Sequence, residues 1–276
     1  MPELPEVEYV ARTLNERFSG RRIRSASLLR PRLAPDSSTE EFAARLQNSG
    51  ISFVHRRGKN ILFDLDNGHT LLAHLRMSGR FMHLTPDDAD PKFTHAVFYL
   101  DDETRLVFDD QRHFGLMKVL ETKQLAHDTS IACLAPEPFS DEFSVEYLRG
   151  TLSRSGRSLK EFLLDQTSVC GLGNIYASEA MFRARVSPRR LGRNVPRTRI
   201  EPLFESIREV LNDAIELANS KFPDPVIIGE GVYGTGTAAD WHVYDREGEP
   251  CRTCTAPIQR IRQGGRSTYY CPKCQR

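Results

Sequence analysis

The sequence predicts an α+β protein of more than one domain, and three patterns along the chain support this prediction. Apolar runs of strand length dominate residues 21–120, whereas residues 143–222 carry apolar side chains at helical spacing. Two C-x-x-C pairs close the chain, a pattern typical of a small metal-bound module. At 276 residues the chain is long enough for two domains of ordinary size.

The chain opens with MPELPEVE, which is typical of a helix start. Proline and acidic side chains suit the first turn of a helix, and the apolar stripe from Val7 to Phe18 continues it. The same residues also permit a chemical interpretation. If Met1 is removed, Pro2 presents a secondary amine that can attack a carbonyl-like carbon, and Glu3 lies beside it as a proton donor or acceptor.

Residues 21–120 predict a mostly antiparallel sheet, arranged as a sandwich or barrel. Turns are expected at 66–68, where the chain reads DNG, and at 101–103. The prolines and polar residues after the sheet indicate a linker. The expected division is therefore an N-terminal β domain at 1–133, a linker at 134–142, a helical domain ending in a Gly/Pro/Thr-rich loop at 143–240 and a C-terminal module at 241–276.

Composition favours a cytosolic protein that binds a polyanion. The chain is 39% hydrophobic and 27% charged, no stretch approaches a membrane span, and the charged N-terminus does not resemble a signal peptide. The net charge is +1, but residues 149–199 hold eleven Lys/Arg against three Asp/Glu, whereas residues 84–148 hold five against fourteen. A basic half beside an acidic edge suggests a polyanion on one face, and a solvated basic surface is the open alternative.

The strongest local signal is the pair of knuckles CRTC and CPKC, which lie sixteen residues apart. Four thiolates complete a tetrahedral zinc site and leave no open position, so one structural Zn²⁺ is expected. Two disulfides are the alternative, which a cytosolic chain disfavours. The ligands are Cys251, Cys254, Cys271 and Cys274. The hairpin between the knuckles carries Arg266 at its tip, a suitable probe of nucleic acid.

A second signal is LLDQTSVCGLGNIYASEAMF at 163–182. Its glycines precede a helix that begins at Asn174, and such a helix N-terminus can bind an anion. A helical hairpin turn with nothing bound is the alternative. The nearby Arg154, Arg157 and Lys160 favour phosphate.

Large and basic side chains at predicted turns give a third signal. Lys59 could contact phosphate or take part in catalysis, although a lone lysine is usually a surface residue. Met77, Arg112 and Phe114 suit the wedges that fill the gap left by an extruded base. An ordinary core position is the alternative for Met77 and Phe114.

Taken together, these stretches resemble the formamidopyrimidine-DNA glycosylase family nearly end to end. The matching stretches, in chain order, are PELPEVE, RRGK, HLRMSG, RHFG, LLDQTSVCGLGNIYASEA, VYDREGEPC and the cysteine knuckles. The resemblance implies an N-terminal β-sandwich with flanking helices, a helix–two-turns–helix domain and a zinc-ribbon β-hairpin, with DNA in the cleft. It also implies a monomer of the bacterial cytosol or nucleoid that binds damaged double-stranded DNA and no membrane.

The resemblance assigns roles to the candidate residues. Pro2 would attack C1′ of the damaged nucleotide through a Schiff base, and Glu3 would act as general acid and base. Lys59 would assist elimination near the 3′ phosphate. Arg266 would bind phosphates from the zinc hairpin. The DNA contacts implied by the family are His74, His95 and Asn174, with Met77, Arg112 and Phe114 as the void-filling trio.

Two departures from the family qualify this assignment. His113 stands where the family often has a second arginine, which weakens one positive contact. The segment KFPDPVIIGEGVYGTGTAADWH does not align with the family loop that covers 8-oxoguanine. The lesion range is therefore expected to shift toward ring-opened purines and abasic sites.

Two other functions remain open from the sequence. An enzyme of the endonuclease VIII branch would remove oxidised pyrimidines, although Lys59, RHFG and PELPEVE favour the formamidopyrimidine branch. A lesion-binding protein without catalysis would use the same scaffold. Retention of Met1 would produce that silent protein, because the nitrogen of Pro2 would then be an amide.

Overall fold

The computed structural model describes residues 1–221, 227–228 and 241–276, which group into two compact units. The first unit holds residues 1–132 with the described residues between 218 and 228, and the second holds residues 133–217 and 241–276. The finer domain division expected from the sequence stays a prediction. Most of the divergent segment at 223–240 lies outside the described residues.

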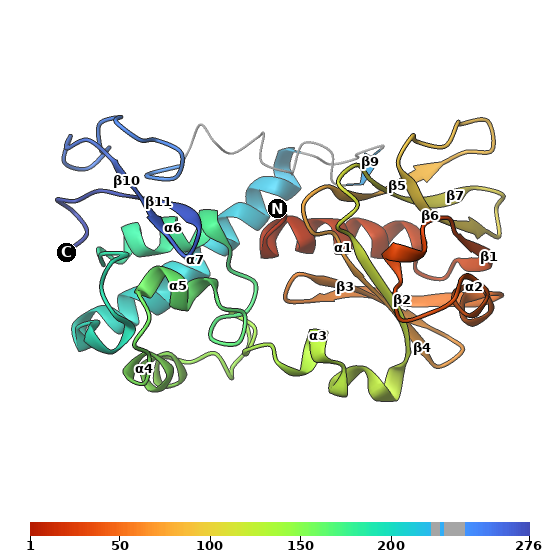
Figure 1. Ribbon diagram of the computed structural model, residues 1–276, viewed down its shortest axis with the longest axis horizontal. Coiled ribbons are helices and arrows are strands. Elements are labelled where there is room, and N and C mark those ends of the chain that lie inside the picture. The colour runs from red at the N-terminus through yellow and green to blue at the C-terminus, as the bar shows by residue number, and fades with distance from the viewer. Residues whose placement is uncertain (222–226, 229–240) are drawn as a thin grey trace. The chain divides into compact units, whose positions relative to one another are not determined.

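The first unit combines a few helices with a set of antiparallel strands (Figure 1). Its helical elements are α1 (Leu4–Phe18), η1 (Pro31–Leu33), α2 (Thr39–Leu46), η2 (Thr122–His127) and α3 (Thr129–Ala132). Its strands are β1 (Arg22–Leu28), β2 (Ser49–Arg57), β3 (Asn60–Leu65), β4 (His69–His74), β5 (Gly79–Leu84), β6 (Thr94–Leu100), β7 (Arg105–Asp110), β8 (Leu116–Glu121) and β9 (Ile227–Ile228).

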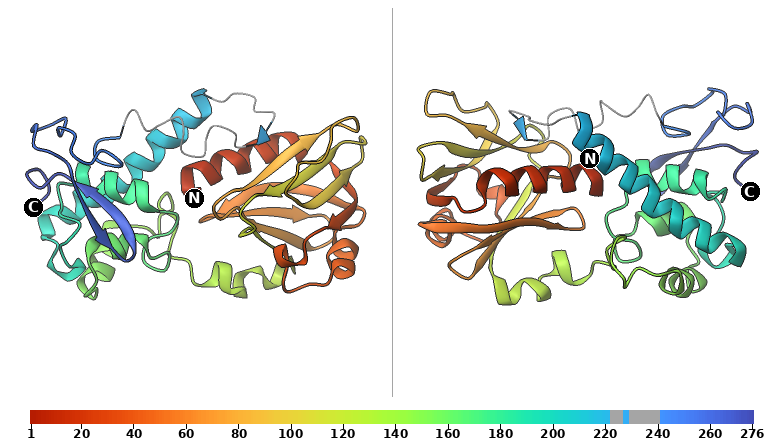
Figure 2. Two further views of the ribbon diagram at one scale, coloured as in Figure 1. Left: turned by 45° about the horizontal axis from the view of Figure 1, so that its top comes forward. Right: turned by 180° about the vertical axis from the view of Figure 1, so that it is seen from behind.

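These strands form a sandwich, as predicted. Their order among the described residues is β8-β4-β3-β2-β1-β6-β7-β5-β9, and every pairing is antiparallel. Only two residue pairs join β1 to β2, so the sheet divides into two halves at that point (Figure 2). The ring of Phe63 on β3 lies 5.6 Å from that of Phe81 on β5, and both belong to one buried apolar core.

Helices flank the sandwich. The helix predicted at the N-terminus is confirmed as α1, which packs against β2 and buries its apolar stripe. The prediction of continuous β structure over 21–120 is wrong at α2, which packs against β1. The Ser38 side chain accepts a hydrogen bond from the backbone N–H of Glu41, and the Glu41 side chain accepts one in return. This capping box was a readable helix signal.

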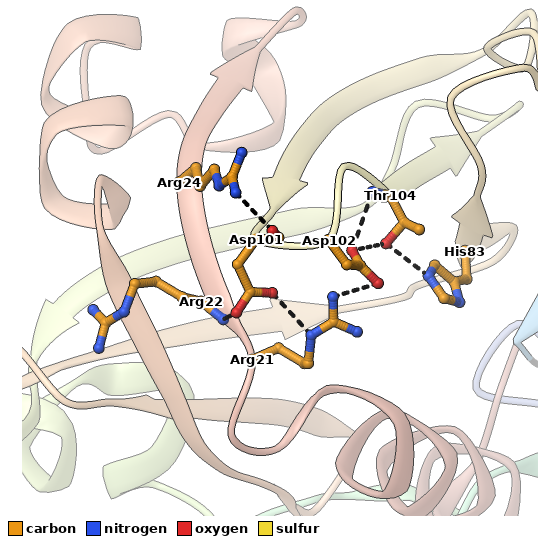
Figure 3. Close-up of polar contacts among 7 residues, drawn as sticks. All are labelled: Arg21, Arg22, Arg24, His83, Asp101, Asp102 and Thr104. Atoms are coloured by element: carbon orange, nitrogen blue, oxygen red, sulfur yellow. Dashed lines mark hydrogen bonds and ion pairs between the residues drawn. The ribbon is translucent and has the colours of Figure 1, made fainter.

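Both predicted turns are confirmed, and the acidic one is held by arginines at the start of β1 (Figure 3). Arg21 Nε lies 2.9 Å from a carboxylate oxygen of Asp101, and its guanidinium also pairs with Asp102. The hydrogen bond from Arg21 holds the pKa of Asp102 well below its ordinary value. Part of the acidic edge expected from the charge distribution is therefore neutralised within the protein.

The second unit is helical and carries the cysteine module. Its elements are α4 (Val145–Ser153), α5 (Leu159–Leu164), α6 (Asn174–Arg183), η3 (Gly192–Asn194), most of α7 (Arg197–Lys221), β10 (Gln259–Gln263) and β11 (Arg266–Tyr270). The helical structure predicted between 143 and 222 is thereby confirmed. Gly264 and Gly265 join β10 to β11 with φ angles of 52° and 77°, which glycine adopts without a steric penalty.

No helix among the described residues is both long and apolar enough to cross a membrane.

Candidate active site

The N-terminal residues place a carboxylate directly beside Pro2. Glu3 is the N-cap of α1, and its side chain is only 3% exposed. Its backbone N–H donates to Glu6 Oε2 at 2.7 Å, while its own carboxylate accepts from the N–H of Glu6. Pro2 is buried as well. The capping box therefore fixes both the backbone and the side chain of the residue that follows the candidate nucleophile.

Lys59 occupies a tight turn between β2 and β3. Arg57 pairs with Asn60 across this hairpin, and Gly58 has a φ of 61° that favours glycine. Lys59 is 7% exposed, so it is not the solvated surface lysine that was the alternative. At the end of β2, Arg56 Nε lies 2.6 Å from Glu8 Oε2, which ties this hairpin to the second turn of α1.

His74 lies beside the Lys59 turn, because it pairs with Asn60 across β3 and β4. Its Nδ1 accepts a hydrogen bond from the backbone N–H of Arg76 at 3.0 Å. A neutral ring with Nδ1 as acceptor carries its proton on Nε2. Burial, with the nearby charges of Arg76 and Lys59, lowers the pKa of His74 to about 3. His74 is therefore a neutral hydrogen-bond donor suited to a phosphate oxygen.

The three predicted wedge residues lie at two turns of the first unit. Met77 follows β4, and Arg112 and Phe114 lie between β7 and β8. Met77 is 41% exposed and Phe114 is 47% exposed, so neither is an ordinary core residue. The guanidinium of Arg112 lies 5.3 Å from the centre of the Phe114 ring, a favourable cation–π distance.

One buried carboxylate, which the sequence reasoning missed, connects these two turns. Asp110 has no exposed surface, and its Oδ1 accepts from Ser78 Oγ and from the N–H of Arg112 at 3.2 Å. Its Oδ2 accepts from the N–H of Gly115 at 2.7 Å. An aspartate at the start of a turn that ends in glycine was the available signal.

His95, which the resemblance implied to be a DNA contact, is buried. It is 3% exposed, and its Nε2 lies 3.1 Å from the carbonyl oxygen of Asp110 and 2.9 Å from Nδ1 of His113. Its Nδ1 is buried as well, so neither ring nitrogen faces solvent. A direct contact of His95 with DNA stays a prediction.

In the second unit, Asn174 and Arg266 lie on adjoining elements. The side-chain amide of Asn174, the first residue of α6, donates to the carbonyl oxygen of Ser267 at 3.0 Å. Ser267 directly follows Arg266, which is exposed at the start of β11. Gly173 caps α6 without a side chain, in agreement with the predicted glycine approach.

Lys160 does not lie on the surface as a phosphate ligand, which corrects the interpretation from sequence. It has no exposed surface, and its ammonium donates to the carbonyl oxygen of Asn174 and to Ser178 Oγ, each at 2.7 Å. The sequence could not show this, because the charge alone does not reveal burial. Lys160 instead supports the N-terminal turn of α6.

Glu179 is a second buried residue that the sequence reasoning missed. Its carboxylate accepts hydrogen bonds from the backbone N–H groups of His242, Val243 and Tyr244, each at 2.9 Å. Burial raises its pKa, but the hydrogen bonds outweigh burial and the net shift is downward. Glu179 lies on α6 and thereby anchors the segment that leads into the cysteine module.

The four predicted zinc ligands converge. Their sulfur atoms lie within 4.8 Å of one another, with Cys254 and Cys271 at 3.4 Å and Cys251 and Cys274 at 3.9 Å. Zn–S bonds of about 2.3 Å at tetrahedral angles separate sulfur atoms by about 3.8 Å. The donor set and its spacing therefore fit one structural Zn²⁺.

The candidate residues divide between the two units. The first unit holds Pro2, Glu3, Lys59, His74, Met77, His95, Arg112 and Phe114, and the second holds Asn174, Arg266 and the four cysteines. The first group offers a carboxylate beside an N-terminal proline, a buried lysine and a neutral imidazole. The second offers an exposed arginine on a metal-stapled hairpin.

Comparison with known families gives matches along most of the chain. Residues 1–117 match the formamidopyrimidine-DNA glycosylase N-terminal domain, and residues 134–224 match the formamidopyrimidine-DNA glycosylase H2TH domain. Residues 248–276 match a zinc finger found in formamidopyrimidine-DNA glycosylase and isoleucyl-tRNA synthetase.

Individual relatives match this chain over 99–100% of their length. A formamidopyrimidine-DNA glycosylase of Ruegeria sp. is 42% identical over all of both chains. That of Pelotomaculum thermopropionicum is 39% identical, with 100% of this chain and 99% of the relative covered. Among solved structures, Lactococcus lactis Fpg in complex with abasic-site DNA has a TM-score of 0.90 at 33% identity, with 99% of each chain covered.

Proposed function

Because this chain belongs to the formamidopyrimidine-DNA glycosylase family, we propose that it removes oxidised or ring-opened purines from DNA and then cleaves the strand at the resulting abasic site. The chain is accordingly an enzyme of base excision repair, with glycosylase and lyase activities. Damaged double-stranded DNA is its substrate, and we infer that a monomer acts in the bacterial cytosol. The Lactococcus lactis relative has been solved with abasic-site and Fapy-dG DNA, which supports this substrate class.

The observation that carries the proposal is the buried Glu3 carboxylate beside Pro2. Once Met1 is removed, the nitrogen of Pro2 is a secondary amine rather than an amide. This nitrogen forms a bond to C1′ as the bond from C1′ to the damaged base breaks. Glu3 lies within the same backbone turn and serves as the proton donor and acceptor that opens the sugar.

Strand cleavage follows from the same adduct. The iminium ion formed at C1′ acidifies the protons on C2′, and loss of one proton expels the 3′ phosphate by elimination. Lys59, at the turn beside His74, assists this elimination. The neutral His74, with Asn174 and Arg266 of the second unit, binds the phosphates. The exposed Met77, Arg112 and Phe114 fill the space that the extruded nucleotide leaves.

The zinc finger has a structural role in this proposal. Cys251, Cys254, Cys271 and Cys274 would hold the ion, and four sulfur ligands leave no position for a substrate. When bound, the ion crosslinks the two knuckles. The β10–β11 hairpin then presents Arg266 in a fixed place.

The decisive experiment is covalent trapping with borohydride on a duplex that contains an abasic site. The protein without Met1, verified by intact mass, should form a stable adduct, and a form with an N-terminal extension should form none. Pro2→Gly is a poor control, because a glycine N-terminus is also an amine. Unimpaired trapping by the extended form would falsify Pro2 as the nucleophile.

Substrate preference is tested separately by single-turnover excision. Duplexes carrying 8-oxoguanine, formamidopyrimidine-guanine, an oxidised pyrimidine or an abasic site are compared. Release of the ring-opened purine should be faster than that of 8-oxoguanine, because poorly stacked bases are extruded at a lower free-energy cost. Fastest release of the oxidised pyrimidine would assign the protein to the endonuclease VIII branch instead.

A further inference from the structure

Two histidines of the first unit form a direct ring-to-ring contact next to the candidate wedge residues. His95 lies on β6, and His113 lies in the turn between β7 and β8. Nε2 of His95 is 2.9 Å from Nδ1 of His113, and the ring centres are 4.9 Å apart. A hydrogen bond at this contact requires one proton between the two nitrogens.

The surroundings of His95 decide which ring carries that proton. Its Nε2 also lies 3.1 Å from the carbonyl oxygen of Asp110, which can only accept. Its Nδ1 is fully buried and has no hydrogen-bond partner among the described residues. A proton on Nδ1 would be a buried donor without an acceptor, whereas a proton on Nε2 faces two acceptors. His95 therefore carries its proton on Nε2 and donates to His113.

The burial of His95 keeps this ring neutral. Burial lowers the pKa of His95 and outweighs the opposing effect of Asp110, while the charge of Arg30 lowers it further. A neutral ring with its proton on Nε2 cannot accept there. His113 is consequently the acceptor at Nδ1, and a neutral His113 must carry its own proton on Nε2.

His113 can donate the hydrogen bond of its Nε2–H to a group outside the protein. The residue is exposed and stands between Arg112 and Phe114, with a φ of 58° in the left-handed region. Its ring also makes an edge contact with Phe93, with centres 6.0 Å apart. Its Nε2 has no hydrogen-bond partner among the residues that the structure describes.

We propose that His95 is a positioning residue that selects the tautomer of His113, so that His113 presents an Nε2–H donor to an acceptor on duplex DNA. This inference rests on the proposed function, because it requires DNA to lie against the 110–115 turn. It assigns His95 an indirect role, through His113, in place of the direct contact expected from the sequence. The acceptor is either a phosphate oxygen or the base left unpaired opposite the lesion.

The first test measures the tautomers directly in the free protein. Two-bond ¹⁵N–¹H correlation spectra distinguish a proton on Nδ1 from one on Nε2. At neutral pH both His95 and His113 should carry the proton on Nε2, and His95→Leu should leave His113 in a mixture of tautomers. If His113 of the wild-type protein carries its proton on Nδ1, the proposal is wrong. This result does not depend on whether the enzyme is active.

The second test is a double-mutant cycle on binding to a duplex with an abasic-site analogue. His113→Leu should weaken binding by about fivefold, which corresponds to one hydrogen bond of about 1 kcal/mol. His95→Leu should weaken binding less, because part of His113 still carries its proton on Nε2. The double variant should be no weaker than His113→Leu alone. His95→Gln keeps an N–H donor at similar reach and should stay within about twofold of the wild type. Additive effects would show that His95 acts independently of His113.

Controls separate this role from general damage to the sheet. His83→Leu alters another histidine of the same sheet, whose Nε2 contacts Thr104 Oγ1 at 3.0 Å, and should leave DNA affinity unchanged. Changing the base opposite the lesion identifies the acceptor. A coupling that depends on that base shows that the base is the acceptor, and a constant coupling shows that a phosphate oxygen is the acceptor. If His95→Leu does not fold, the wild-type tautomers and His95→Gln still decide the proposal.

Discussion

The side-chain amide of Asn174 donates a hydrogen bond to the carbonyl oxygen of Ser267, at 3.0 Å. This bond joins the first residue of α6 to the residue that follows Arg266 on β11. The two elements also pack against each other within the second unit. The position of the exposed arginine is therefore set by the helix start as well as by the metal module.

Removal of Arg266 should reduce the salt dependence of DNA binding. Each cationic contact with phosphate contributes roughly one unit to the slope of log affinity against log salt, so Arg266→Ala should lower the slope by about one. Titration by fluorescence anisotropy across several salt concentrations measures it. Arg260→Ala is the matched control, because Arg260 on the same hairpin is paired with Glu247 at 3.0 Å. An unchanged slope in Arg266→Ala would mean that this arginine does not contact phosphate.

Removal of zinc should weaken DNA binding without unfolding the sheet of the first unit. Elemental analysis should find one zinc per chain, held by the four close cysteine sulfurs. After chelation, hydrogen exchange should become fast in β10 and β11 and stay slow in β3 and β4, because the core of the sandwich contains no cysteine ligand. A metal-free protein that binds and cleaves DNA normally would contradict this expectation.

His74 should make the protein less stable in mild acid. Its pKa is about 3 in the folded protein against an ordinary 6.5, so the unfolded state binds the extra proton between these values. The free energy of unfolding should therefore fall as pH drops below 6.5, by at most about 1.4 kcal/mol per pH unit for one proton. Urea unfolding at pH 7 and pH 5 measures the loss.

A variant pair isolates the contribution of His74. His74→Asn keeps an acceptor for the N–H of Arg76 but does not titrate, and should lose less stability between these pH values than the wild type. His127→Asn, at an exposed residue of η2, should behave as the wild type does. Equal losses in all three proteins would show that His74 is not responsible.

A side chain at Gly79 should destabilise the sandwich beneath the wedge turns. A Cβ there would lie 2.6 Å from both the carbonyl oxygen of Leu75 and the ring of Phe108. Gly79→Ala should lower the free energy of unfolding by about 1–3 kcal/mol, the usual cost of overpacking. Gly150→Ala lies inside α4 with nothing within 4 Å and should raise it by about 0.5–1 kcal/mol. Chemical denaturation measures both changes. An unchanged free energy of unfolding in Gly79→Ala would show that the backbone around residue 79 shifts at little cost to accept the side chain.

The sequence alone determined the features that depend on local spacing. Strand-length apolar runs with turn residues between them predicted an antiparallel sandwich or barrel. Helical periodicity predicted α1 and the helical structure that spans α4 to α7. The two cysteine knuckles predicted the metal site, because each tight turn supplies two ligands. Even α2 had a local signal in the capping box of Ser38 and Glu41. These features are readable because their physical causes lie within a few neighbouring residues.

Only the tertiary structure decided which polar side chains are buried and which residues they hold. Asp110 accepts a hydrogen bond from Ser78, which lies thirty-two positions away in the sequence. Glu179 accepts one from the backbone of Val243, sixty-four positions away. The ring of His95 on β6 contacts that of His113, which follows β7. Lys160 is a further residue whose burial the sequence did not reveal. It was predicted to face phosphate, but its ammonium donates a hydrogen bond to the carbonyl oxygen of Asn174. A buried charge or imidazole is stable only with partners that satisfy it, and folding brings those partners from distant parts of the chain.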